Sequence, residues 1–289
     1  MAAHQWETMA KGGFIEERYG IFLKRCVYLY DMATIGIFDS GSGGLSVYRE
    51  LVKVLPQERY LYFSDNAHCP YGEKTPEYIQ DRGRAITDIL LGMGADIIVV
   101  ACNTATAAAI ATLRAEYPHV PFVGMEPAVK PAALGTQTGV IGVLATAGTL
   151  KGSKYLNTRG QYEDNVTIVE HVGQGFVELV ENGILDGPEA ESTVRASLQP
   201  LLNVGADTIV LGCTHYPFLR PVIERLAGPG VQVIDPAPAV ARQTLRVLQE
   251  HGVTIGKGPF SVDLYASGDL SALGRIYALV SDAAQHIDS

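Results

Sequence analysis

An internal repeat is the feature that most constrains the fold of this chain. The stretch 94–102, GADIIVVAC, matches the stretch 205–213, GADTIVLGC, and upstream the segment 35–38, IGIF, matches 141–144, IGVL. The repeat predicts two related units, each opening with an Ile-Gly strand and each carrying one cysteine at the end of a later strand. Buried strands of any kind share Val, Ile and Ala, but identity at Gly, Ala, Asp and Cys in one register favours a true repeat.

Between these segments, short β-branched runs alternate with Ala- and Leu-rich segments, which is typical of parallel α/β sheets. The run 97–100, IIVV, is apolar throughout, as expected where helices cover both faces of a sheet. We therefore predict an α/β fold of two pseudo-symmetric domains with mainly parallel sheets and an active site in the cleft between them. The predicted strands are 35–38, 60–63, 96–100, 120–124, 140–144, 166–170, 208–211 and 231–234. The predicted helices are 44–55, 76–93, 103–116, 188–203, 216–227 and 237–250.

The repeat also suggests how the chain is divided. We predict a first α/β domain from 34–128 plus 236–289, and a second from 129–235, because the last stretch should return to pack on the first unit. Residues 1–33 carry scattered charges and no continuous apolar segment, so they do not predict a signal peptide. They are either an N-terminal extension or the product of an upstream start, with Met32 opening the domain.

Composition argues against several classes of partner. The formal net charge is −9 and the basic residues form no cluster, which disfavours a nucleic-acid or anionic-membrane surface. No apolar run reaches the roughly 18 residues of a membrane span. The cysteines at 26, 69, 102 and 213 fit neither a disulfide framework nor a CxxC metal knuckle. We expect free thiols in a cytoplasmic protein, with Cys26 a small buried residue.

Cys102 and Cys213 stand where a predicted strand ends and a helix begins. In an open α/β sheet, ligands bind beyond the carboxyl ends of the strands, where unpaired N–H groups favour anions and activate thiols. Two similar units facing each other would hold the two thiols across one cleft. This geometry suits removal of a proton from one face of a tetrahedral carbon and return of a proton to the other face.

Three loops rich in neutral hydrogen-bond donors point into the same cleft. They are 39–44, DSGSGG, whose glycines permit close backbone approach to an anion, 65–72, DNAHCPYG, and 146–149, TAGT. They would bind an acidic substrate with few cations.

Other interpretations of these residues are open to test. Cys69, His68, Cys213 and His215 could form a zinc site, although the spacing is not that of structural zinc sites. Cys213 with His215 could suggest a cysteine hydrolase, but residues two apart on one turn should not place the imidazole over the thiol. The glycines lack a phosphate-binding pattern. Asp39 could cap the following helix. Two α/β lobes also describe a periplasmic-type binding protein.

Four motifs together resemble the glutamate racemase family over the chain from about 34 onward: FDSGSGG at 38–44, PYG at 70–72, ACNTA at 101–105 and GCTHYP at 212–217. The resemblance implies cofactor-independent interconversion of L- and D-glutamate, which supplies D-glutamate for peptidoglycan. It implies a homodimer and no metal. Racemases of the same superfamily that act on aspartate or a hydantoin are the nearest alternative.

The resemblance also implies roles for individual residues. Cys102 would act on D-glutamate and Cys213 on L-glutamate, assisted by Asp39 and His215. Asp65 and Glu181 correspond to auxiliary acidic positions. In place of a Cys-Pro pair found in many members, this chain has Gly173-Gln174-Gly175. The substrate-binding positions would be Asp39, Ser40, Tyr71, Gly72, Asn103, Thr104, Thr146, Thr149, Thr214 and His215.

Overall fold

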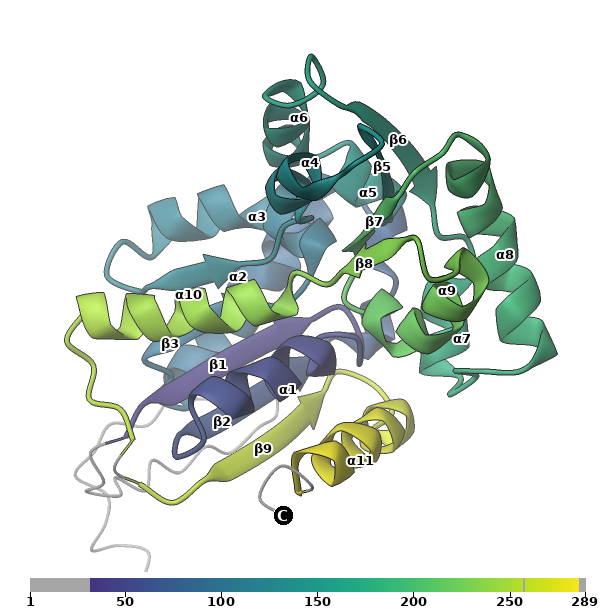
Figure 1. The fold of residues 1–289 in the computed structure, drawn as a ribbon. Coiled ribbons are helices and arrows are strands. Elements are labelled where there is room, and N and C mark those ends of the chain that lie inside the picture. Colours follow the sequence, from purple (N-terminus) through teal and green to yellow (C-terminus); the bar gives the residue numbers. More distant parts are fainter. Residues whose placement is uncertain (1–31, 257, 286–289) are drawn as a thin grey trace, which may run out of the picture.

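A computed structural model describes residues 32–256 and 258–285. The strands form two parallel sheets (Figure 1). The first has the order β4-β3-β1-β2-β9, and the second has the order β6-β5-β7-β8. The first comprises β1 (Thr34–Asp39), β2 (Arg59–Ser64), β3 (Ile97–Val100), β4 (Phe122–Gly124) and β9 (Ser261–Ala266). The second comprises β5 (Val140–Ala145), β6 (Thr167–Val172), β7 (Thr208–Gly212) and β8 (Gln232–Ile234).

The two sheets share one topology. Strands β1 to β4 occupy the same relative positions as β5 to β8, and β1 pairs with β3 as β5 pairs with β7. The glycines of the two Ile-Gly strands are equivalent as well. A Cβ at Gly36 would lie 2.9 Å from Ile98 Cδ1, and one at Gly142 would lie 2.8 Å from Ile209 Cδ1. Each glycine therefore makes room for an isoleucine of the neighbouring strand, which explains why the repeat retains it.

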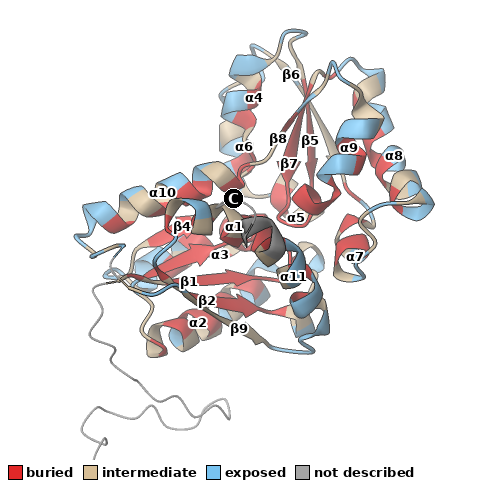
Figure 2. Ribbon diagram, turned by 60° about the horizontal axis from the view of Figure 1, so that its bottom comes forward, coloured by how far each residue is buried: buried red, intermediate tan, exposed pale blue. Residues whose placement is uncertain are grey.

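Helices cover both faces of the first sheet. Ile35 and Ile37 of β1 lie in the core shared with α1 (Leu45–Val54) and α10 (Ala237–Glu250). Phe38 points to the opposite face, under α2 (Pro76–Gly92) and α3 (Asn103–Glu116). This alternation follows from the two-residue period of a strand. Figure 2 shows the central strands buried and the outer faces of the helices exposed, with the edge strands β6 and β9 intermediate.

The second sheet is also covered on both faces. The helices α8 (Pro188–Asn203) and α9 (Arg220–Ala227) contribute to the larger core, and α4 (Val129–Gly135) and α6 (Ser153–Gly160) to a smaller one. Two short helices, α5 (Ala147–Leu150) and α7 (Phe176–Glu181), lie toward the first sheet, where α7 contacts α11 (Ser271–Gln285). The 3₁₀ turns η2 (Asn66–His68) and η3 (Tyr71–Glu73) follow β2.

The predicted α/β class with two mainly parallel sheets is confirmed, but one predicted helix is divided and several elements, β9 and the helices α4 to α7 and α11, were not predicted. The predicted helix 216–227 is a 3₁₀ turn, η4 (Tyr216–Leu219), followed by α9, because Pro217 and Pro221 each begin a new helical segment. Strand β9 was not predicted, since its residues are all half-buried and include Asp263. The predicted domain boundaries stay predictions, although the first sheet draws strands from both ends of the described chain. Residues 1–31, with Cys26, lie outside it.

Candidate active site

A pocket lies between the carboxyl ends of the two sheets. The first half of the chain and the second both supply its walls, and both cysteines singled out in the repeat line it. The lining residues are Ser40, Pro70, Tyr71, Gly72, Cys102, Asn103, Thr104, Thr146, Val177, Cys213, Thr214 and His215. In each sheet the strand order changes direction between two neighbouring strands, β1 and β3 in the first sheet and β5 and β7 in the second, and the later strand of each pair precedes the cysteine. Ligands of open α/β sheets bind at such a switch point.

Cys102 follows β3 and is the N-cap residue of α3. Its Sγ accepts a hydrogen bond from the N–H of Ala105 at 3.4 Å, and its thiol donates to Ser40 Oγ at 3.8 Å. The side chain is buried, and burial raises the pKa of the thiol well above its usual value, with a further contribution from the Asp39 carboxylate. The helix N-terminus is therefore not enough to activate this thiol, which needs a proton acceptor close by.

Asp39 ends β1 and is fully buried behind Cys102. Its Oδ2 accepts from the N–H of Gly44 at 2.8 Å, the residue before α1, and both carboxylate oxygens lie 3.5 Å from Thr214 Oγ1. Burial raises the pKa of Asp39, against the opposing effect of His215. The carboxyl therefore binds the N–H of the N-cap residue and is not itself the side-chain cap of α1. It is also more easily protonated than an ordinary aspartate.

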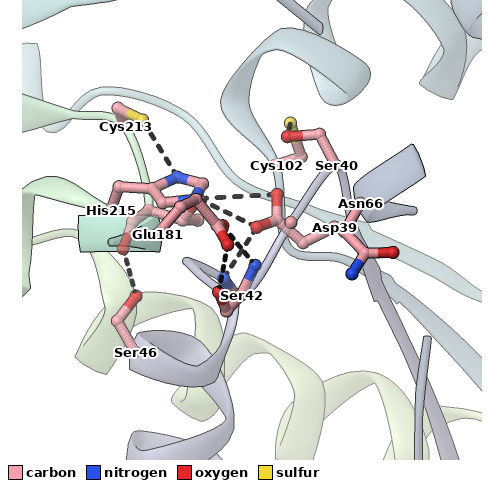
Figure 3. Close-up of polar contacts among 12 residues, drawn as sticks. Asp39, Ser40, Ser42, Ser46, Asn66, Cys102, Glu181, Cys213 and His215 are labelled. Atoms are coloured by element: carbon pink, nitrogen blue, oxygen red, sulfur yellow. Dashed lines mark hydrogen bonds and ion pairs between the residues drawn. The ribbon is translucent and has the colours of Figure 1, made fainter. Parts of the chain in front are cut away.

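Cys213 has a different partner. Its Sγ lies 3.7 Å from His215 Nδ1, and His215 Nε2 lies 2.7 Å from Glu181 Oε1 (Figure 3). Burial opposes charge on the imidazole, but the hydrogen bonds to Cys213 and Glu181 outweigh it and raise the pKa of His215 well above its usual value. The objection that residues two apart cannot place the imidazole beside the thiol is therefore wrong, because the chain turns tightly directly after β7, where the N–H of Tyr216 donates to the carbonyl of Cys213 at 3.2 Å.

Glu181, from the end of α7, is held by a residue that sequence reasoning did not single out. The N–H and the hydroxyl of Ser42 donate to its two oxygens, each at 2.7 Å. Burial alone would raise the pKa of Glu181, but the hydrogen bond to His215 and the Ser42 donors lower it to about 2. Ser42 lies within the glycine-rich loop, so its position was the available signal.

The glycines of this loop admit the imidazole rather than a bound phosphate. A Cβ at Gly43 would lie 2.6 Å from Cγ of His215, and one at Gly41 would overlap the Glu181 carboxylate. The space beside these glycines is thus filled by the His215–Glu181 pair, and their close approach to a bound anion stays a prediction.

Several neutral donors face the pocket from both halves. Thr104 and Thr146 line the pocket and form a triangle of hydroxyls with Thr149 behind them, with oxygen separations of 2.8, 2.9 and 3.3 Å. The Asn103 side chain is buried, and both of its amide atoms lack a hydrogen-bond partner among the described residues. A buried amide without a partner loses free energy unless a ligand supplies the hydrogen bonds.

Asp65 is placed behind the pocket wall rather than in it. Its carboxylate accepts from Tyr71 OH and from two nitrogens of Arg82, at 2.9 and 2.7 Å. Burial alone would raise the pKa of Asp65, but these partners lower it. Arg82 was not predicted, because it follows Asp65 by seventeen residues on α2 and carries no motif. Asp39, Thr149 and Glu181 likewise contact lining residues from behind.

Comparison with known proteins fits this arrangement. A family model described as Asp/Glu/Hydantoin racemase matches residues 35–244. The chain belongs to this racemase family. A glutamate racemase from Ectopseudomonas mendocina is 46% identical over 248 residues, which cover 86% of this chain and 94% of the relative. The predicted family resemblance is confirmed.

Solved racemases share the fold. A glutamate racemase isoform from Bacillus anthracis matches with a TM-score of 0.78 and 31% identity, covering 86% of this chain and 94% of that one. The Escherichia coli glutamate racemase, solved with L-glutamate and the activator UDP-MurNAc-ala, matches with a TM-score of 0.77 and 32% identity, covering 87% and 95%. In this racemase, none of the helices within the described residues is long and apolar enough to cross a membrane.

The zinc set considered from the sequence is not assembled in this racemase. Within the described ranges, the potential ligands that come together are Cys69, Glu181 and His215, not His68 or Cys213. The His68 ring instead lies 2.5 Å from the hydroxyl of Tyr78.

Proposed function

We propose that this protein interconverts L- and D-glutamate without a cofactor, by transferring protons to and from Cα through Cys102 and Cys213. The observation that carries the proposal is that two buried thiols at equivalent strand ends line one pocket, with the Asp39 carboxyl beside Cys102 and the His215 imidazole beside Cys213. A hydrolase would need one thiol and would leave the other unexplained. The choice of glutamate rests on the named relatives, and the two-base chemistry rests on the site.

The reaction from L-glutamate starts with the Cys213 sulfur as thiolate and Cys102 as thiol. The His215 imidazolium, supported by Glu181, stabilises negative charge on the Cys213 sulfur. This thiolate removes the Cα proton, and the Cys102 thiol returns a proton to the opposite face. The pair ends with its protonation reversed, so D-glutamate can react in the other direction. Asp39, whose raised pKa allows it to carry a proton, serves Cys102 as proton partner.

The negative charge that develops on the substrate needs hydrogen bonds in a site without bulk water. We assign Asn103, whose amide lacks an internal partner, and the hydroxyls of Thr104, Thr146 and Thr214 to this task. Thr149 supports the other two threonines from behind, and Ser40 orients the Cys102 thiol. Tyr71 and Gly72 form the wall next to Cys102. In this scheme Asp65 is a positioning residue for Tyr71, and Glu181 a positioning residue for His215.

Racemisation of L-glutamate in D₂O, without pyridoxal phosphate, tests the two-base scheme. Deuterium should appear at Cα of the D-product, because the returning proton comes from a thiol that exchanges with solvent. Protium retained at that carbon would overturn the scheme. A panel of glutamate, aspartate and hydantoins, separated by chiral chromatography, distinguishes the substrates.

The physiological setting belongs to the same proposal. D-glutamate for peptidoglycan is the expected use of the product, the reducing cytoplasm is the expected location, and a homodimer is the expected assembly. Light scattering on the purified protein would test the assembly.

A further inference from the structure

Cys69 is a third thiol beside the proposed catalytic groups, and the racemase mechanism does not use it. It lies between η2 and η3, is half-buried and forms no disulfide. Its Sγ, a carboxylate oxygen of Glu181 and a ring nitrogen of His215 all lie within 4.8 Å of one another. The three atoms come from three separate segments of the chain, so the fold itself brings them together.

Sulfur, imidazole nitrogen and carboxylate oxygen together are a donor set that suits Zn²⁺. With bond lengths of about 2.0–2.3 Å, two ligands of one tetrahedral zinc ion lie roughly 3.5 Å apart. Small side-chain movements from the present separations would reach that geometry, with the bond between His215 Nε2 and Glu181 opening to admit the ion. The thiolate and the carboxylate would balance the charge of the ion, so the half-buried site would be neutral.

Two of these three side chains, Glu181 and His215, are already held by contacts to their other polar atoms. Ser42 donates to Glu181 from its N–H and its hydroxyl, and Cys213 Sγ lies against the other ring nitrogen of His215. Outer partners of this kind fix the direction of metal ligands and contribute to affinity. These hydrogen bonds already hold the Glu181 and His215 side chains in place, so the cost of arranging these two ligands on binding is small.

We propose that Cys69, Glu181 and His215 form a binding site for Zn²⁺ or a similar thiophilic divalent cation, and that its occupation inhibits the enzyme. On binding, the thiol proton of Cys69 and the proton shared by His215 Nε2 and Glu181 pass to solvent, and a water molecule completes the tetrahedron. The metal then occupies Nε2, so the ring can no longer become the imidazolium that stabilises the Cys213 thiolate through Nδ1. The inhibition rests on the proposed racemase function, whereas the binding does not.

Cadmium binding to the full-length, reduced protein tests the site, because Cd²⁺ bound to a thiolate gives an ultraviolet absorption band. The wild type should bind one high-affinity equivalent with this band. Cys69→Ala should weaken binding by more than the roughly 10–100-fold that loss of an outer partner costs, and Ser42→Ala by about that amount. The matched control is Cys26→Ala, which removes a thiol and should bind as the wild type does.

Activity provides the second readout. Zn²⁺ should inhibit the wild type and Cys26→Ala, with recovery on adding EDTA. Cys69→Ala should keep its basal racemisation and need about 100-fold more Zn²⁺ for the same inhibition. Equal Cd²⁺ affinity in Cys69→Ala and wild type, or loss of binding in Cys26→Ala, would overturn the proposal and point to other thiols. If binding depends on Cys69 but the wild type does not racemise glutamate, the metal site stands and the proposed function fails.

Discussion

Cys102 and Cys213 follow equivalent strands of equivalent sheets, yet the groups that would exchange protons with them come from different places in the two units. When the Ile-Gly strands are aligned, Asp39 at the end of β1 corresponds to Ala145 at the end of β5. When the cysteines are aligned, His215 corresponds to Thr104. The first unit therefore supplies a carboxyl from its opening strand, and the second supplies an imidazole from the turn after its cysteine. The two thiols therefore occupy equivalent positions in the repeat, whereas the groups that would exchange protons with them do not.

The equilibrium of the reaction limits how the difference between the two halves can appear in the kinetics. L- and D-glutamate have equal free energies in water, so kcat/KM must be equal in the two directions for the wild type and for every variant. Asymmetry between the two halves can therefore appear only in kcat and KM separately, or in exchange of the Cα proton with solvent. The following variants test the comparison on that basis.

The largest effect is expected when either thiol is removed. Cys102→Ala and Cys213→Ala should each reduce racemisation in both directions by at least about 10²–10⁴-fold, because each direction needs both groups. Circular dichroism of the glutamate solution measures the rate, with Cys69→Ala as a control that keeps it. Cys102→Ala should still exchange the Cα proton of L-glutamate with D₂O without inversion. Undiminished racemisation in either alanine variant would refute the paired assignment.

The next largest effect should distinguish the two partner groups. Asp39→Asn and His215→Gln should each lower kcat/KM by roughly 10²–10³-fold, since each removes a group that takes a proton from a thiol. His215→Gln should suppress solvent exchange from L-glutamate more than from D-glutamate, and Asp39→Asn the reverse. Mass spectrometry of both enantiomers in D₂O gives this ratio. Identical ratios in the two variants would mean that the partners are not dedicated to separate thiols.

A smaller effect should follow from Glu181→Gln, which keeps the shape of the side chain and removes its charge. Glu181 raises the pKa of His215, so the variant should move the alkaline limb of the kcat/KM profile to lower pH and cost about 10-fold at pH 8. A limb at the same pH in both proteins would show that His215 does not control it.

The free energy of unfolding should also depend on the His215–Glu181 pair. The raised pKa of His215 gives stability that is complete below the unfolded value of about 6.5 and is lost as pH rises through the folded value. The pKa of Glu181, lowered from 4.5 to about 2, gives stability that is present above 4.5 and lost as pH falls toward 2. Urea unfolding should therefore find the largest difference between wild type and Glu181→Gln between about pH 4.5 and 6.5.

The smallest effect on activity is expected behind Tyr71, on the Cys102 side. Arg82→Gln leaves Asp65 buried without its ion-pair partner, so it should lower the free energy of unfolding by about 3 kcal/mol and raise KM several-fold more than it lowers kcat. Arg84→Gln is the matched control, since Arg84 pairs with Glu116 on the surface and should leave KM unchanged. Arg82→Lys should restore KM in part. Equal KM in all three variants would show that the position of Tyr71 does not affect substrate binding.

Strands that are apolar along their whole length were predicted from the sequence, whereas a strand whose residues are only half-buried was missed. Strands β3 (Ile97–Val100) and β7 (Thr208–Gly212) were predicted to within one residue, as 96–100 and 208–211, because they are buried on both faces. Strand β9 is half-buried along its whole length, and helices α4 to α7 and α11 were likewise not predicted. The cysteines were found because the repeat marks strand ends. Ser42, Arg82 and the contact between Cys213 and His215 depend on loop geometry and on segments that meet only after folding.

Strand β9 has a consequence for how this protein is made. It pairs with β2, and about 200 residues separate the two in the chain. All four strands of the second sheet are synthesised before β9, so for much of translation β2 is the open edge of the first sheet. That edge carries Tyr60, Leu61, Tyr62 and Phe63, and an apolar edge strand recruits other chains. Premature termination before residue 261 should therefore yield a chain that aggregates rather than a smaller enzyme, and the nascent protein should depend on chaperones until its last strand emerges.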